Sequence, residues 1–114
     1  MNWLEHEYLI PIIIGKSKRH RRIATEIYRR TRIRVHFFNE GFSFFQRLTW
    51  ECHTVSPLRS EFLVESLISF IRSQNEYYFP VLIICDDGER SFIEENSEMI
   101  ESVLLVVDGK DIFD

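Results

Sequence analysis

Apolar residues follow one another without alternation in two segments of the chain. Residues 8–14 read Tyr-Leu-Ile-Pro-Ile-Ile-Ile, and residues 81–85 read Val-Leu-Ile-Ile-Cys. Uninterrupted apolar runs of this length are typical of strands buried on both faces, which occur mainly in parallel sheets covered by helices. The two runs therefore predict neighbouring strands at the centre of a parallel sheet.

Three further segments have the composition of strands. They cover residues 35–38, 48–55 and 103–107. In 48–55 polar and apolar positions alternate, which is typical of a strand with one face partly exposed to water. We therefore expect 48–55 to form an edge strand.

Apolar residues recur at helical spacing in three segments between these strands. The spacing predicts helices over residues 18–32, about 61–74 and about 89–102. Each helix follows a residue that can cap it: Ser17, Ser60 and Asp87. In the third helix four apolar residues are expected to face the core: Phe92, Ile93, Met99 and Ile100.

The order of these elements is β-α-β-β-α-β-α-β. Right-handed crossovers place the helices on both faces of a parallel sheet. We therefore predict a single domain over residues 1–114 of the α/β class, a three-layer sandwich with a Rossmann-like parallel sheet of about five strands in the order 3-2-1-4-5. Such sheets bind ligands at the carboxyl ends of their strands, beside the switch point, which lies here between strands 1 and 4.

Charge is distributed unevenly along the chain, although the formal net charge is only -4. Residues 1–50 carry ten Lys and Arg against four Asp and Glu, whereas residues 51–114 carry four against fourteen. A basic segment of this kind can mark a nucleic-acid surface. Here the arginines fall on several sides of the first predicted helix and Glu26 interrupts them, so the pattern favours solvated helix faces over nucleic-acid binding.

Neither the apolar runs nor the cysteines indicate a membrane or secreted protein. No segment reaches the roughly 18 apolar residues that a membrane span needs, and the first seven residues carry acids where a signal peptide is basic. Cys52 and Cys85 each lie in a predicted strand, which is typical of buried thiols in a reducing compartment. We therefore expect a soluble, cytoplasmic protein.

The first candidate site follows the first strand, at Gly15, Lys16 and Ser17. These residues are similar to the end of a phosphate-binding P-loop, but an isoleucine replaces the glycine that this motif requires five residues earlier. A Gly-x-Gly-x-x-Gly dinucleotide motif is also absent. The remaining possibility is the positive N-terminus of a helix with Lys16, Lys18 and Arg19 nearby, which can hold an anion; a tight turn with solvated lysines is the alternative.

The second candidate site follows the strand 81–85, at Asp86, Asp87 and Gly88. Carboxylates at this edge can bind a metal ion or accept hydrogen bonds from a substrate amine. The alternative is local, because Asp87 can cap the next helix while Gly88 provides the turn. Both candidate sites lie at the same edge of the predicted sheet.

The sequence contains no complete catalytic or metal-binding motif. A Gly-x-Ser-x-Gly elbow is absent, and the four histidines have no metal-ligand spacing: His6, His20, His36 and His53. A phosphoacceptor receiver domain shares the predicted topology but needs acidic residues after strand 1, where this chain has Gly15 and Lys16. We therefore assign no catalytic residue and no metal ligand from the sequence.

Several segments together resemble a known family. They are Ile10-Pro11-Ile12-Ile13-Ile14-Gly15, the helix with Arg22-Ile23-Ala24, the run Pro80-Val81-Leu82-Ile83-Ile84-Cys85-Asp86-Asp87-Gly88, and the strand 103–107. The chain resembles the N-terminal domain that precedes the ATP-grasp fold in carboxylate–amine ligases, particularly the carbamoyl-phosphate-synthase-like and D-aspartate-ligase-like proteins. The resemblance covers nearly the whole chain.

This resemblance implies that residues 1–114 form the N-terminal part of a longer ligase, which joins a carboxylate to an amine or thiol through an acyl phosphate. In that family ATP and magnesium are bound by later subdomains. The resemblance therefore implies no cofactor and no catalysis in this chain alone, and two partners: the downstream ATP-grasp domains and a small-molecule second substrate. Of the glycine-rich loop that contacts substrate in several relatives, only Gly15 is matched.

A second hypothesis belongs to a different class of protein. The charge-divided surface and the incomplete motifs are also typical of a stand-alone, non-catalytic module. Such a module would bind a small anion or a nucleotide at the ends of strands 8–14 and 81–85, or a partner protein on the aromatic segment 42–50. Both hypotheses use the same candidate residues for a small ligand: Gly15, Lys16, Ser17, Asp86, Asp87 and Gly88.

Overall fold

The computed structural model describes residues 3–15, 17–38, 52–56, 63–101 and 104–112. In chain order the elements are the short 3₁₀ helix η1 (Trp3–Glu5), β1 (Leu9–Ile14), α1 (Lys18–Thr31), β2 (Val35–Phe38), β3 (Cys52–Ser56), α3 (Leu63–Arg72), β4 (Phe79–Ile84), α4 (Asp87–Glu95), α5 (Ser97–Glu101), β5 (Leu105–Asp108) and the 3₁₀ helix η3 (Gly109–Ile112).

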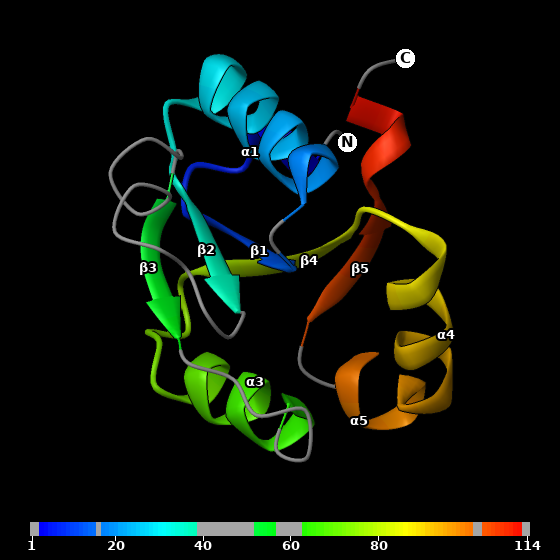
Figure 1. The fold of residues 1–114 in the computed structure, drawn as a ribbon. Helices are drawn as coiled ribbons and strands as arrows, with labels where there is room; N and C mark the ends of the chain where they lie inside the picture. Colours follow the sequence, from blue (N-terminus) through cyan, green and yellow to red (C-terminus); the bar gives the residue numbers. More distant parts are fainter. Residues whose placement is uncertain (1–2, 16, 39–51, 57–62, 102–103, 113–114) are drawn as a thin grey trace.

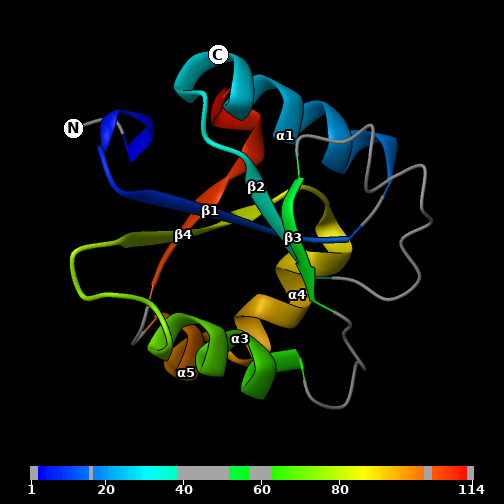
Figure 2. The ribbon, with the colours of Figure 1, turned by 90° about the vertical axis from the view of Figure 1, so that its left-hand side faces the viewer.

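The strands form one parallel sheet with helices on both faces. The five strands lie in the order β3-β2-β1-β4-β5, and each neighbouring pair is parallel. Helix α1 and η3 lie on one face, and α3, α4 and α5 lie on the other (Figures 1 and 2). The predicted α/β class, a parallel sheet covered by helices, is therefore confirmed.

Strands β1 and β4, which contain the two apolar runs, pair with each other from Leu9 opposite Phe79 to Ile13 opposite Ile83. Each contains a proline, a residue that lacks the N–H donor of a sheet ladder. Pro11 precedes the part of β1 that pairs with β2, and Pro80 precedes the part of β4 that pairs with β5. The prolines are tolerated in central strands because they lie where each strand has a single neighbour.

Side chains from the two faces of the sheet form two hydrophobic cores. The core under α1 contains Leu9, Ile13, Ile23, Ala24, Ile27, Val35, Phe37, Val81, Ile83, Cys85 and Ile112. The core over α3, α4 and α5 contains Ile12, Leu67, Leu82, Ile84, Ile93, Ile100 and Leu104. Consecutive residues of β1 and β4 enter opposite cores, so their runs are apolar without alternation.

Helix α1 begins and ends close to its predicted bounds. Ser17 is its N-cap, as predicted, and Ile23, Ala24 and Ile27 are buried against the sheet. Arg32 closes the helix in the left-handed conformation (φ 63°), with its N–H donated to the Tyr28 carbonyl at 2.8 Å. The helix therefore has one apolar face, while its remaining surface carries basic residues.

The third predicted helix was wrong in its extent. It is two helices, α4 and α5, because α4 ends at the cap Asn96. Ile93 in α4 and Ile100 in α5 are buried as predicted, but Met99 is 51% exposed. The predicted N-cap of this helix, Asp87, was also wrong, because Asp86 caps α4 and Asp87 is already its first residue.

Other predicted bounds shifted by a few residues. Strand β4 begins at Phe79, two residues before the predicted strand, and β5 covers Leu105–Asp108. The expected Asp108-Gly109 turn continues as η3. The predicted cap Ser60, residues 48–51 of the predicted edge strand and the aromatic segment 42–50 lie outside the described residues. None of the helices in the described ranges is long and apolar enough to cross a membrane.

Candidate functional site

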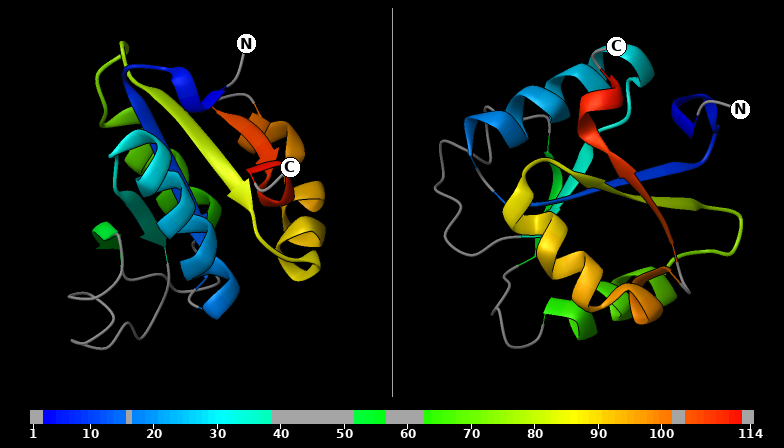
Figure 3. Two further views of the ribbon diagram at one scale, coloured as in Figure 1. Left: turned by 90° about the horizontal axis from the view of Figure 1, so that it is seen from above. Right: turned by 90° about the vertical axis from the view of Figure 1, so that its right-hand side faces the viewer.

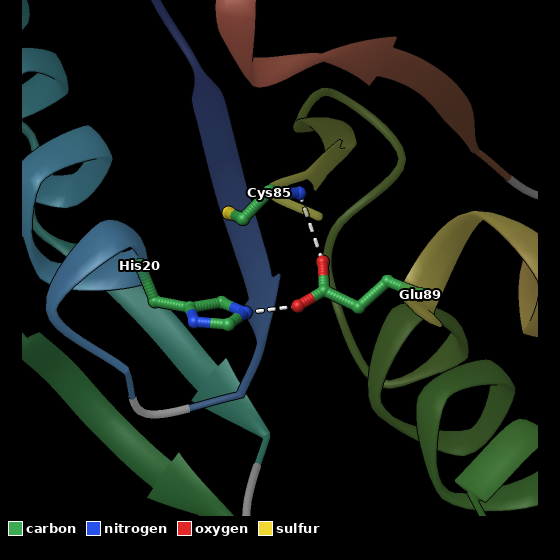
Figure 4. Close-up of side chains that lie close together, drawn as sticks. All are labelled: His20, Cys85 and Glu89. Atoms are coloured by element: carbon green, nitrogen blue, oxygen red, sulfur yellow. Dashed lines mark hydrogen bonds and ion pairs between the residues drawn. The ribbon is translucent and has the colours of Figure 1, made fainter. Parts of the chain in front are cut away.

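The carboxyl ends of β1 and β4 lie side by side, and each leads into a helix on a different face of the sheet (Figure 3). Helix α1 follows β1, and α4 follows β4. His20 and Glu89 each occupy the third position of their helix. Their side chains extend toward each other across the switch point of the sheet, with Cys85 next to their contact (Figure 4).

His20 is held on both ring nitrogens, although it is only 4% exposed. Its Nδ1 accepts a hydrogen bond from the Ser17 backbone N–H at 3.1 Å, and the Ser17 Oγ lies 2.5 Å from the same nitrogen. Because Nδ1 is an acceptor, the ring proton belongs on Nε2, which donates to Glu89 Oε1. The second carboxylate oxygen, Oε2, accepts from the Cys85 backbone N–H at 2.9 Å.

This network joins the starts of α1 and α4 to the end of β4. Asp86 Oδ1 accepts the Glu89 N–H at 3.1 Å as the cap of α4, and its Oδ2 lies 3.8 Å from His20 Nε2. Among the residues that the structure describes, no buried side-chain N or O atom lacks a hydrogen-bond partner. A buried polar cluster in which every group is bonded rigidifies its surroundings.

Gly15 makes room for the His20 ring. Its φ of 126° is rarely adopted by residues with a side chain, and a Cβ at this position would lie 2.6 Å from His20 Cε1. The glycine predicted as a ligand-binding residue therefore has a definite structural role, which is to let β1 turn beneath the histidine.

The structure brings together part of the predicted site. Gly15, Ser17 and Asp86 all contact the His20 cluster or lie against it. The Asp87 side chain is 96% exposed and outside the cluster, 3.9 Å from Arg90 Nε. Gly88 lies in the first turn of α4, and Lys16 lies outside the described residues.

A cavity of about 560 Å³ opens at the same edge of the sheet, between α1, the end of β4 and η3. Four of its lining residues are cationic: Lys18, Arg19, Arg22 and Lys110. The others are Ile23, Cys85 and Gly109. The cavity is therefore lined both by basic residues and by apolar surface.

The η3 side of this cavity is fixed by charged groups at the end of β5. Asp108 Oδ1 accepts the Lys110 N–H at 2.9 Å, and Oδ2 pairs with Arg90. The Lys110 hydrogen bond, followed by Arg90, lowers the pKa of the Asp108 carboxyl. The carboxylate is therefore ionised at neutral pH and holds η3 against α4.

Farther along α1 the basic residues are engaged within the chain. Glu26 Oε2 accepts from Arg29 Nε at 3.1 Å and Oε1 accepts from Arg30 Nε at 2.8 Å. The bond from Arg29 is the main cause of the lowering of the Glu26 pKa to about 2. Arg29 and Arg30 do not line the cavity. The basic residues at the start of α1 therefore line the cavity, whereas these two arginines are paired with Glu26.

The Cys85 thiol lies in the wall of the cavity but is not an activated nucleophile. Burial raises the pKa of Cys85, and the nearby Glu89 and Asp86 carboxylates raise it further. The thiol is therefore protonated at neutral pH, and its Sγ lies 3.8 Å from the Ile83 carbonyl oxygen. The prediction of a buried, free thiol is confirmed for Cys85.

Sequence reasoning missed the pairing of His20 with Glu89 and the contribution of Arg22 and Lys110 to the cavity. For the His20–Glu89 pair the sequence did contain a local signal. Ser17-x-x-His20 and Asp86-x-x-Glu89 both have the spacing of a helix cap and the third residue of its helix. Parallel pairing of the two preceding strands then brings those third positions together. The cavity has no such signal, since η3 lies far from α1 in sequence.

The fold and the cavity together define an α/β domain with a basic pocket at the carboxyl edge of its sheet. Comparison of the chain with models of protein families, with curated proteins and with solved structures gives no match in any of the three.

Proposed function

We propose that this domain binds a small organic anion, carrying phosphate or carboxylate, in the cavity between α1, β4 and η3. The observation that carries this proposal is the convergence of four cationic side chains on one cavity at the β1–β4 switch point. Open α/β sheets bind their ligands at this position. The proposed activity is recognition, and no residue of the chain is assigned a catalytic role.

The N-terminus of α1 favours an anion at this place. Lys18 and Arg19 lie in its first turn, where the backbone N–H groups and the helix dipole add positive potential. No salt bridge of Lys18, Arg19 or Lys110 occurs among the described residues. A bound anion would therefore neutralise charges for which the described residues form no salt bridge.

The size of the cavity favours an organic molecule over a bare ion. Its volume of about 560 Å³ lies within the ~300–1,000 Å³ of typical small-molecule sites. Ile23 and Gly109 offer apolar contacts beside the cationic groups. The ligand class that fits is a molecule with a phosphate or carboxylate group and a partly apolar body.

We further propose that this Rossmann-like domain is the pre-ATP-grasp domain of a carboxylate–amine ligase, with the cavity contacting the second substrate. The sequence resemblance supports this proposal. The cavity at the carboxyl ends of the paired strands β1 and β4 also supports it. ATP and magnesium would be bound by downstream domains, which would also form the acyl phosphate. The present chain alone would then have no ATPase activity.

A stand-alone anion-binding module is the alternative, and the basic cavity supports it equally. The ligase proposal requires catalytic domains downstream of this one, whereas the module requires none. Coding sequence beyond Asp114 with a glycine-rich flap and acidic magnesium ligands would support the ligase, and a gene without such sequence would support the module. Magnesium-dependent ATP turnover by residues 1–114 would contradict both.

The cavity is tested by isothermal calorimetry with inorganic phosphate, citrate and adenosine monophosphate as probes. We expect at least one probe to bind and its affinity to fall about tenfold or more in Lys18→Gln/Lys110→Gln, because each lost charge–anion bond contributes about 1.5–3 kcal/mol. Arg34→Gln is the matched control, since Arg34 lies beside Tyr28 and outside the cavity. Equal losses in both variants, or no binding of any probe, would overturn the proposal.

A further inference from the structure

Three side chains that can each offer a different kind of metal-ligand atom lie close together at the carboxyl ends of β1 and β4. A ring nitrogen of His20, Cys85 Sγ and a Glu89 carboxylate oxygen all lie within 4.8 Å of one another, and the nitrogen that contacts Glu89 is Nε2. His20 and Cys85 are buried, and the Glu89 side chain is only 11% exposed. No sequence motif indicates this set, because its members come from α1, the end of β4 and α4 (Figure 4).

We propose that His20, Cys85 and Glu89 bind a divalent transition-metal ion of the zinc type, with one coordination position left for a water or an anionic ligand. Imidazole nitrogen, thiolate sulfur and carboxylate oxygen are the three donor types that zinc prefers in proteins. Three protein ligands with an open fourth position are typical of reactive, as opposed to structural, zinc sites. Cys85 also lines the basic cavity, so the open position would be adjacent to it.

The distances require only a small adjustment. In a tetrahedral zinc site the nitrogen, oxygen and sulfur donors lie roughly 3.4–3.6 Å apart, as zinc–ligand bonds of about 2.0–2.3 Å dictate. The His20–Glu89 contact would therefore open, while donors at the 4.8 Å limit would approach by up to about 1.4 Å. Rotation of side chains on the fixed ends of α1, α4 and β4 is sufficient for a change of this size.

Ser17 can accept a hydrogen bond from the ring proton of His20 when a metal ion occupies Nε2. A metal needs the lone pair of His20 Nε2, so the ring proton must move to Nδ1. The Ser17 Oγ lies 2.5 Å from Nδ1 and can accept it, as outer hydrogen-bond partners of metal-bound histidines commonly do. The hydrogen bond from the Ser17 N–H to Nδ1 is lost in exchange.

In the metal-bound state, the negative charges of the Cys85 thiolate and the Glu89 carboxylate would balance the two positive charges of a divalent ion. The Cys85 side chain is buried, and burial disfavours a thiolate that has no positive partner. With metal, Cys–SH and M²⁺ give Cys–S–M⁺ and one released H⁺, and the Glu89 carboxylate neutralises the remaining charge. The buried complex is then electrically neutral, which avoids the desolvation cost of an unpaired buried ion.

This proposal is independent of the proposed anion binding, and cobalt(II) tests it directly. The metal-free chain is titrated with cobalt chloride, and the thiolate-to-cobalt charge-transfer band is followed in the near ultraviolet. We expect saturation at about one ion per chain, release of about one proton per ion by calorimetry in two buffers, and displacement by zinc. Absence of the band, or saturation without proton release, would overturn the proposal.

Variants assign the band to these ligands. Cys85→Ser should abolish it, and Glu89→Gln should weaken cobalt binding tenfold or more, whereas Cys52→Ser is the matched control and should leave the band unchanged. Far-ultraviolet circular dichroism verifies that each variant is folded. Loss of the band in Cys52→Ser, or its persistence in Cys85→Ser, would contradict the assignment.

A second readout uses the unmodified chain and does not depend on the folding of any variant. Zinc should raise its melting temperature, and a chelator should reverse the increase. No increase at saturating zinc would count against the site. Phosphate titrations in chelator then test the anion cavity without metal, so failure of one proposal is distinguishable from failure of the other.

Discussion

The two ends of the β1–β4 pair differ in chemistry, although the same two strands form both. At the carboxyl end the His20–Glu89 network is buried, and a basic cavity lies beside it. At the amino end Tyr8 and Tyr78 pack edge to face at 6.0 Å, and Tyr77 is 71% exposed. Helices α1 and α4 begin at the carboxyl end, so their N–H groups and first-turn side chains converge there, whereas η1 and α3 end before the amino ends of β1 and β4.

Two histidines make the comparison concrete. His6 at the amino end and His20 at the carboxyl end both accept a backbone N–H at Nδ1, from Tyr8 at 3.2 Å and from Ser17 at 3.1 Å. His6 stacks on Phe79 at 4.5 Å near the surface, while His20 is buried with Glu89. The hydrogen bond from a backbone N–H to Nδ1 is therefore part of surface packing at His6 and part of a buried polar network at His20.

Gly15→Ala should have the largest effect on stability. It adds a Cβ where φ is 126° and where the His20 ring already lies, so we expect a loss of about 3–5 kcal/mol in the free energy of unfolding. Urea denaturation measures this loss. In the His20→Ala background the steric part should disappear and the backbone strain remain, so an equal loss in both backgrounds would exclude the contact with His20.

His20→Ala should destabilise the domain by about 2–3 kcal/mol, because it leaves Glu89 Oε1 buried without its donor. His6→Ala, the matched change at the amino end, should cost about 1 kcal/mol or less, since its hydrogen bond is exposed. Chemical denaturation of both variants provides the test. Equal costs would show that the two ends do not differ as described.

The sequence was sufficient for the class of the fold but not for the site. Residues 9–14 and 81–85 are apolar at every position because the two segments contribute to both cores, and this pattern is local. The break at Asn96 was not predicted, because the apolar residues Ile93 and Ile100 keep helical spacing across it.

The site depends on contacts between segments far apart in the chain. His20 and Glu89 are 69 residues apart in sequence, and each taken alone is an ordinary third residue of a helix. The cavity likewise needs Lys110 from η3 opposite Lys18 from α1. The cap Ser17 was predictable from its own segment, whereas the pairing of His20 with Glu89 also required the order of the strands.

Alkaline pH should weaken the carboxyl end through Cys85. Its pKa is raised in the folded state by burial, so above the unfolded value near 9 the unfolded chain binds fewer protons than the folded one. Stability should fall as pH rises beyond about 9, by at most about 1.4 kcal/mol per pH unit. Metal-free Cys85→Ser should lack this contribution, so identical pH profiles for the two proteins between about pH 8 and 10 would contradict the buried thiol.

Arg90→Gln should have the smallest effect on stability, because its pair with Asp108 is partly exposed and screened by solvent. The lowered pKa of Asp108 means that this contribution is present above the unfolded value near 3.8 and is lost as pH falls through the folded value. Thermal melts of both proteins at neutral and acidic pH should therefore converge on acidification. A difference that grows toward low pH would contradict the pairing.

The most direct test of the anion cavity is a titration of the ¹⁵N-labelled, metal-free chain, followed by amide chemical shifts, with inorganic phosphate, citrate and adenosine monophosphate as probes. We expect saturable shifts at Lys18, Arg19, Cys85 and Lys110, at the carboxyl end, with at least one probe. The amides of Asn75 and Tyr77, which line a hollow at the amino end, should remain unchanged. Shifts confined to the amino end, or none with any probe, would contradict anion binding at the carboxyl end.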